Sequence, residues 1–195
     1  MHRRLRPEAY GGLVHRVKMA GATYPVHNDV LSSHALVKVE DKTSSYLLPM
    51  AFPEGSPMHP AYGAGHATVA GACTTILKAW FEESFPITEL TLPLKPGQLG
   101  PALGTPKVPA ADGLSLIDYT GSDKDQLTVG GELNKLAANI AIGRNHAGVH
   151  WYTDYSESLT LGEEIAIGVL EEHALTDREG GSFTLTRFDG SQVAT

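Results

Sequence analysis

The chain has 195 residues, of which 42% are apolar, with a formal net charge of -7 and a single cysteine. This length and apolar content are enough for a sizeable core, so we expect an ordinary soluble protein with one domain, residues 1–195. The negative charge argues against nucleic acid as the main partner. One cysteine excludes an internal disulfide and a cysteine zinc site, and no apolar run reaches the roughly 18 residues of a membrane helix. The compartment stays unassigned.

The amino-terminal part of the chain predicts one short helix and a long extended segment. The helix begins after Pro7, a residue that suits a first helical turn, and glycines at positions 11, 12 and 21 are expected to keep it short. Residues 46–60 contain four prolines, so we expect extended backbone there. His59 therefore lies on a loop rather than inside a helix or strand.

A clear helix is predicted near residues 65–82, where apolar side chains recur at intervals of three and four residues. This apolar stripe consists of Val69, Cys73, Ile76, Leu77, Trp80 and Phe81. We expect Cys73 to be buried and inert, as free cysteines usually are. Residues 86–113 contain six prolines and four glycines, too many for regular structure, and predict a long ordered connector.

Two more helices and a hairpin complete the expected elements. Apolar spacing predicts a helix near residues 127–147 that carries Arg144 at its far end, and another near 156–174 with Ser156 as its amino-terminal cap. Alternating residues around Asp189 and Gly190 predict a hairpin over 183–193. The whole pattern is typical of a mainly α fold with a small carboxyl-terminal β-hairpin.

Two histidine segments offer groups that bind anions or exchange protons. A Gly-x-Gly-His turn lies immediately before the helix near 65–82, so the amides of Gly65 and His66 can face an anion with the helix dipole behind them. Taken alone, His66 is equally well explained as a solvated histidine at a helix start. A third group of cations, the arginines within residues 3–7, precedes the first predicted helix.

Near the end of the helix at 127–147, Arg144 and His150 are six residues apart and converge if the helix ends near Gly148. His150 and Asp154 have a four-residue spacing that fits an imidazole held by a carboxylate, which fixes the tautomer and raises the basicity of the free nitrogen. A surface ion pair, and an arginine that serves the helix dipole, explain these residues as well.

Together the three segments resemble the active-site pattern shared by vanadium-dependent haloperoxidases and the membrane-type and bacterial acid phosphatases. That pattern is Lys, several residues, Arg-Pro; then Pro-Ser-Gly-His; then Ser-Arg, five residues, His, three residues, Asp. This chain has Arg6-Pro7, then Gly63-Ala64-Gly65-His66, then Gly143-Arg144 through His150 to Asp154. Longer stretches, including GELNKLAANIAIGR at 131–144 and GVHW at 148–151, are similar to the bromoperoxidase branch.

The resemblance implies the carboxyl-terminal, active-site half of a haloperoxidase helical bundle, with vanadate as its cofactor. His150 would be the ligand of vanadium, and Asp154 would hold its ring. Arg6, Arg144 and the amide of Gly65 would bind the vanadate oxygens, as guanidinium groups bind phosphate-like anions.

The resemblance also implies a reaction. His66 would be the acid–base residue that exchanges protons with peroxide, and His59 would shape the halide side of the pocket. Bromide or another halide would be oxidised by hydrogen peroxide to a hypohalous acid equivalent, which halogenates small organic nucleophiles. Neither a redox cofactor nor a second metal is implied. The apolar flank of such a half predicts self-association into a homodimer or larger.

The chain departs from the family pattern at two places. No Lys-Trp segment precedes Arg6-Pro7, which indicates a fragment truncated at its amino terminus, an alternative start or a chain completed by a partner. Gly63 and Ala64 replace the usual Pro and Ser, so one hydroxyl donor is missing. We therefore expect weak activity from this chain alone, with recovery when the missing cation is supplied.

Three other functions remain open on the residues. One is a phosphatase with His150 as nucleophile and a phosphohistidine intermediate. The second is a divalent-metal site formed by His146, His150 and Asp154, although Gly148 interrupts that helix. The third is a non-catalytic module for binding or assembly.

Overall fold

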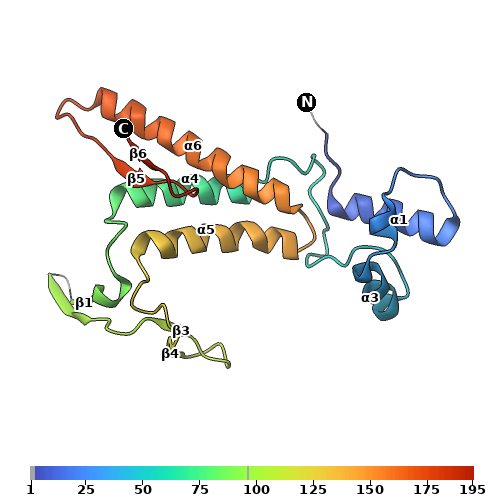
Figure 1. Cartoon of the computed structure of the whole chain (residues 1–195), viewed down its shortest axis with the longest axis horizontal. Helices are drawn as coiled ribbons and strands as arrows, with labels where there is room; N and C mark the ends of the chain where they lie inside the picture. Colours follow the sequence, from blue (N-terminus) through green and yellow to red (C-terminus); the bar gives the residue numbers. More distant parts are fainter. Residues whose placement is uncertain (1–2, 96) are drawn as a thin grey trace. The chain divides into compact units, whose positions relative to one another are not determined.

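The structure is a computed structural model that describes residues 3–95 and 97–195 (Figure 1). In chain order its elements are α1 (Pro7–Ala20), α2 (Asn28–Leu31), α3 (His34–Thr43), α4 (Gly65–Trp80), η1 (Ile87–Glu89), β1 (Thr91–Lys95), β2 (Gln98–Ala102), β3 (Lys107–Pro109), β4 (Leu116–Asp118), α5 (Val129–His146), α6 (Tyr152–Thr176), β5 (Thr184–Thr186) and β6 (Gln192–Ala194). The predicted mainly α fold is confirmed. In the part of the chain that the structure describes, no helix combines the length and the apolar character needed to cross a membrane.

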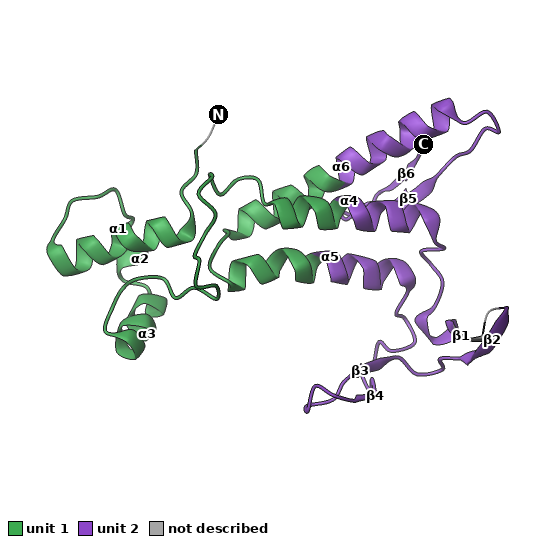
Figure 2. Cartoon of the chain, turned by 180° about the vertical axis from the view of Figure 1, so that it is seen from behind, with its two compact units in different colours: residues 1–71, 138–162 green, residues 72–137, 163–195 purple. Residues whose placement is uncertain are grey.

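The chain divides into two compact units, shown in Figure 2. The first unit consists of residues 1–71 and 138–162, and the second of residues 72–137 and 163–195. Helices α4, α5 and α6 each continue from one unit into the other, so both units contain turns of all three. The prediction of a single domain over 1–195 stays a prediction.

Helix α1 is longer than we expected from the glycines at positions 11 and 12. It runs through positions 11 and 12 and ends at Gly21, whose φ of 62° is in the left-handed region that glycine adopts readily. A Cβ at Gly11 would lie 3.1 Å from the Cβ of Leu48. Gly11 therefore lets the extended segment pack closely on the helix, and the contacts outweigh the low helix propensity of glycine.

Two irregular stretches contain more structure than the sequence indicated. Residues 34–43 form α3, which no apolar pattern predicted, and the Oγ of Ser33 caps it by accepting the amide of Leu36. The expectation of a connector without regular structure over 86–113 is wrong, because β1 pairs with β2 and β3 with β4 in antiparallel ribbons. Both strands of each two-stranded ribbon are edge strands, where proline is tolerated. Pro96 lies outside the described residues.

The long helices and the carboxyl-terminal hairpin lie where the sequence predicted, within a few residues. The start of α6 differs, because the helix begins at Tyr152 and Ser156 is not its cap. The carboxylate of Asp154, in the first turn, accepts the amide of Trp151 at 3.0 Å. This is one half of a capping box, and it places the helix start next to His150.

The interior of the bundle is lined by small side chains rather than by the predicted stripe of α4. Ala67 and Ala70 are buried, whereas Val69 and Trp80 are 62% and 75% exposed. Cys73 is exposed as well, so the prediction of a buried cysteine is wrong.

The small side chains of α4 are buried because α4 and α6 pack closely together. In the first unit a Cβ at Gly71 would lie 2.3 Å from the carbonyl oxygen of Leu159, so α4 and α6 approach through the glycine and alanine face of α4. The stripe of larger residues on α4 then faces outward, and α6 likewise buries Ala166, Ile167 and Leu170 but leaves Leu161, Ile165 and Val169 exposed.

Candidate functional site

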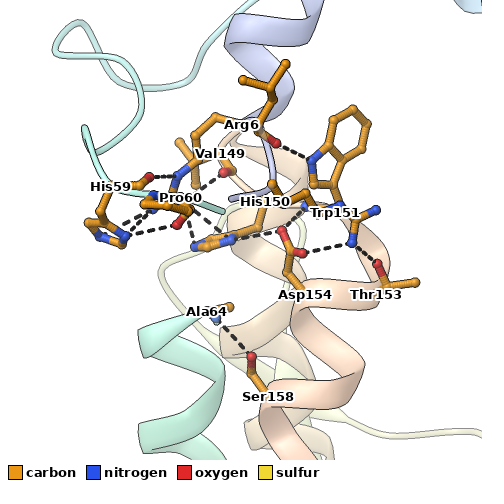
Figure 3. Close-up of polar contacts among 12 residues, drawn as sticks. Arg6, His59, Pro60, Ala64, Val149, His150, Trp151, Thr153, Asp154 and Ser158 are labelled. Atoms are coloured by element: carbon orange, nitrogen blue, oxygen red, sulfur yellow. Dashed lines mark hydrogen bonds and ion pairs between the residues drawn. The ribbon is translucent and has the colours of Figure 1, made fainter. Parts of the chain in front are cut away.

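The three motif segments meet within the first unit, around Arg6 and His150 (Figure 3). Backbone and side-chain hydrogen bonds join them. The amide of Ala61 donates to the carbonyl of Arg4 at 3.0 Å, and the Nε1 of Trp151 donates to the carbonyl of Leu5 at 2.8 Å. The segment before α1 therefore lies between the loop before α4 and the turn between α5 and α6.

Arg6 is buried at the centre of this junction, with 5% of its surface exposed. Its Nε donates to the carbonyl of His59 at 3.0 Å, and its Nη1 donates to the carbonyl of Val149 at 3.0 Å and to the Nε2 of His150 at 2.9 Å. Its Nη2 lies 3.1 Å from the Nδ1 and 3.3 Å from the Nε2 of His59, and the same Nδ1 lies 3.0 Å from the carbonyl oxygen of Pro60. Arg6 thus connects His59 and His150, as the dashed lines in Figure 3 show.

His150 presents one nitrogen to the site and the other to a carboxylate. Its Nδ1 lies 3.3 Å from Oδ2 of Asp154, which is fully buried. Because an ionised carboxylate can only accept, this contact puts the ring proton on Nδ1 and leaves the lone pair of Nε2 toward Arg6.

Burial lowers the pKa of His150 below its ordinary value. The hydrogen bond to Asp154 opposes the shift, and the positive charges of Arg6 and Arg144 add to it. The imidazole is therefore neutral at pH 7, and its Nε2 is available as a ligand or a nucleophile.

Arg144 lies in the last turn of α5, and the α5–α6 turn brings it near His150 as the sequence predicted. Gly148 makes that turn with φ of 80°, where a Cβ would lie 3.0 Å from the Sδ of Met50. The guanidinium of Arg144 lies 5.3 Å from the ring centre of Phe52, in a cation–π contact. Its Nε is buried and has no hydrogen-bond partner among the described residues.

The loop before α4 is held by a hydrogen bond from its backbone to α6. The Oγ of Ser158 accepts the amide of Ala64 at 2.9 Å, and both residues are buried. Gly65 is the first residue of α4, and His66 follows it, with both exposed. No hydrogen bond or ion pair of the His66 side chain is found within residues 3–95 and 97–195.

The donor set fits a tetrahedral oxyanion such as vanadate or phosphate. Two guanidinium groups lie near a neutral imidazole, and the buried Nε of Arg144 lacks the acceptor that such an anion would supply. A cleft of about 720 Å³ lies beside Arg6 and His59.

The alternative of a divalent-metal site at His146, His150 and Asp154 finds no support. His146 is exposed, and in the described part of the chain no group of three such ligands lies together.

The fold agrees with the comparisons to known proteins. The chain belongs to the family of the VCPO second helical-bundle domain, which matches residues 32–176. The vanadium-dependent bromoperoxidases of Corallina officinalis and Corallina pilulifera are each 44% identical to it over 212 residues, and that of Ascophyllum nodosum is 36% identical over 202 residues. These alignments cover 99% of this chain, but the chain spans about a third of the length of the curated relatives it matches.

A solved structure is similar over the same extent. The homohexameric second vanadate-dependent bromoperoxidase from Ascophyllum nodosum superposes with a TM-score of 0.76 at 33% identity, over 99% of this chain and 36% of that one. The resemblance to vanadium-dependent bromoperoxidases is therefore confirmed.

Some residues of the site carried no signal in the sequence. Ser158 and Phe52 lie outside the family motifs, and Arg4 was noted only as part of a basic segment. The four-residue step from Asp154 to Ser158 along α6 is the one pattern that could have indicated Ser158, because it puts both side chains on one helix face.

Proposed function

We propose that this chain is the active-site part of a vanadate-dependent haloperoxidase, which oxidises bromide or another halide with hydrogen peroxide to a hypohalous acid equivalent. The observation that carries the proposal is the buried Nε of Arg144, which has no partner within the described residues although Arg6 and a neutral His150 lie near it. The names of the relatives support the same reaction class.

Vanadate would be bound by the arginines, the amide of Gly65 and the Nε2 of His150, with Asp154 holding the ring. Bound vanadate would supply a Lewis acid that activates peroxide for two-electron oxidation of halide. The guanidinium groups neutralise the charge of the oxyanion, and burial strengthens their effect. Because Arg6 Nη1 contacts His150 Nε2 at 2.9 Å, anion binding is expected to replace that contact.

The two other histidines would act on peroxide and halide. His66 is exposed at the start of α4, where its imidazole would take a proton from peroxide and return one to the leaving oxygen. His59 borders the cleft beside Arg6 and would shape the halide side. Small organic nucleophiles would then be halogenated by the released product.

A bromination assay tests the proposal. The chain is incubated with vanadate, bromide, peroxide and an organic acceptor, and compared with His150→Ala and with His146→Ala, which removes an exposed histidine four residues away. We expect vanadate-dependent bromination that His150→Ala reduces by about 100-fold or more and that His146→Ala leaves unchanged. Equal rates in both variants would contradict the role of His150.

A phosphatase is the second candidate, because the same donors bind phosphate and the free Nε2 of His150 can act as a nucleophile. A phosphate ester assay on the same proteins separates the two. Ester hydrolysis without bromination would favour the phosphatase, and inactivity in both assays would favour a binding or assembly role.

We also propose that the chain self-associates. The similar structure from Ascophyllum nodosum is homohexameric, and this chain exposes large apolar side chains on α4, α5 and α6. Association would cover such side chains.

A further inference from the structure

The carboxylate of Asp154 is fully buried and contacts three groups. Oδ2 accepts the amide of Trp151 at 3.0 Å and faces the Nδ1 of His150 at 3.3 Å, while Oδ1 accepts Nη1 of Arg4 at 3.1 Å. Oδ2 alone therefore faces the imidazole, and which oxygen does so depends on the rotation of the carboxylate. Arg4 contacts the opposite oxygen and fixes that rotation.

Arg4 is itself anchored at two further points. Its Nη1 also donates to Oγ1 of Thr153, and its guanidinium lies 5.5 Å from the ring centre of Trp151. The Trp151 ring is in turn held through its Nε1 by the carbonyl of Leu5. The side chain of Arg4 is 43% exposed, whereas that of Asp154 is 0% exposed, so Arg4 lies between the carboxylate and solvent.

We propose that Arg4 is a positioning residue, which orients Asp154 so that the His150 ring keeps its proton on Nδ1 and directs the lone pair of Nε2 to the oxyanion site. The Arg4 guanidinium contacts Thr153, Asp154 and the Trp151 ring, so it acts on the imidazole through Asp154. Its link to vanadate rests on the proposed function. The orientation of the imidazole does not, because it is a property of this chain's own hydrogen bonds.

Arg3 provides a matched control. It is exposed and carries the same charge one residue away, but it forms no ion pair or hydrogen bond within the part of the chain that the structure describes. Loss of either arginine removes one positive charge near the site. Only loss of Arg4 releases the carboxylate.

The first measurement uses the full chain without vanadate. In ¹⁵N-histidine NMR spectra, protonated and unprotonated ring nitrogens resonate apart, and the His150 signals are assigned as those missing from His150→Ala. We expect the Nδ1-protonated form in the unmodified protein and in Arg3→Ala, and a mixture of the two tautomers in Arg4→Ala. Arg4→Lys, which restores a cation within reach of Asp154, is expected to recover the Nδ1-protonated form.

The second measurement is the vanadate dissociation constant by equilibrium dialysis. We expect Arg4→Ala to raise this dissociation constant about 10-fold, which is the lower end of the effect of losing a group that orients a metal ligand. Arg3→Ala is expected to change the dissociation constant by less than about twofold. An unchanged His150 tautomer in Arg4→Ala, or equal effects of the two substitutions on affinity, would overturn the proposal.

The two measurements separate this proposal from the proposed function. If the unmodified protein does not bind vanadate, the proposed function fails, while the tautomer comparison still decides the role of Arg4. If Arg4→Ala does not fold, Thr153→Ala gives the same test, because it removes one anchor of Arg4 and no charge. A partial shift of the tautomer is then expected, and no shift would overturn the proposal.

Discussion

Ser158 is the residue through which α6 fixes the loop that carries Gly65 and His66. Its Oγ accepts the amide of Ala64 at 2.9 Å, and a Cβ at Gly63 would lie 3.2 Å from the same oxygen. The hydroxyl therefore holds Ala64 directly and leaves little room for a side chain at the preceding position. Since the Ala64 amide is buried, it depends on this one acceptor.

Replacing Ser158 by alanine should destabilise the protein. The Ala64 amide would be left buried without a partner, which costs about 1 to 3 kcal/mol of unfolding free energy. Urea denaturation measures the change. Ser156→Ala, which removes a hydroxyl near the surface of the same helix, is expected to change stability by less than about 0.5 kcal/mol. Similar effects of both substitutions would contradict this role of Ser158.

The sequence predicted the convergence of Arg6, Arg144 and His150, because the motif spacing around Gly148 allows it and the family pattern requires it. It could not predict the partners that hold these groups. Phe52 contacts the guanidinium of Arg144, and Ser158 accepts the amide of Ala64 in the loop before α4. Each partner is distant in the sequence from the group it holds, and such contacts depend on packing rather than on any local spacing. The individual roles of the site residues stay predictions.

At the scale of elements, a buried ion pair joins α4, α6 and the hairpin of β5 and β6 in the second unit. The Nζ of Lys78 lies 3.7 Å from Oε1 of Glu163, and both side chains are almost fully buried. Lys78 also donates to the carbonyl of Thr186, and Glu163 accepts the amide of Phe188 at 2.7 Å. Burial lowers the pKa of Lys78 and raises that of Glu163.

The two charges should be strongly coupled. Lys78→Met leaves the Glu163 carboxylate buried without its cation and is expected to cost about 3 to 5 kcal/mol. Glu163→Gln added to Lys78→Met removes that charge and keeps an acceptor for Phe188, so the double variant should be more stable than Lys78→Met alone. Denaturation of the single and double variants measures the coupling.

An exposed ion pair on α5 is the control for this comparison of single and double variants. Lys135 and Glu132 lie 2.6 Å apart at the surface, and Lys135→Met is expected to cost less than about 1 kcal/mol. Strictly additive effects of Lys78→Met and Glu163→Gln would show that the buried pair is not coupled.

The long helices were predictable in position, but their buried faces were not. Periodicity identifies residues that share a face, and α4 has two such faces, one of alanines and one with Val69, Ile76 and Trp80. The choice between them depends on how closely the neighbouring helix approaches, which Gly71 decides by packing against the Leu159 carbonyl. For the same reason the exposure of Cys73 could not be predicted from the apolar spacing.

At the scale of the whole molecule, the exposed side chains predict self-association. Trp80 is 75% exposed on α4, and Ile165 and Val169 are 51% and 55% exposed on α6. Sedimentation velocity should show a dimer or larger species, and Trp80→Glu should shift it toward monomer. Leu114→Glu, in the loop between β3 and β4, removes a side chain that is 92% exposed and should have no effect. A monomer at all concentrations would contradict this prediction.

We expect Arg6, Arg144 and His150 to form one oxyanion site, and the vanadate dissociation constant is the measurement that decides this. Equilibrium dialysis of the unmodified chain is compared with Arg144→Ala and with Arg178→Ala, which removes an exposed arginine of the second unit. A hydrogen bond to a charged group contributes about 1.5 to 3 kcal/mol, so Arg144→Ala should weaken vanadate binding about 10- to 100-fold, and Arg178→Ala should not change it. No vanadate binding by the unmodified chain, or equal affinity in Arg144→Ala, would contradict the claim.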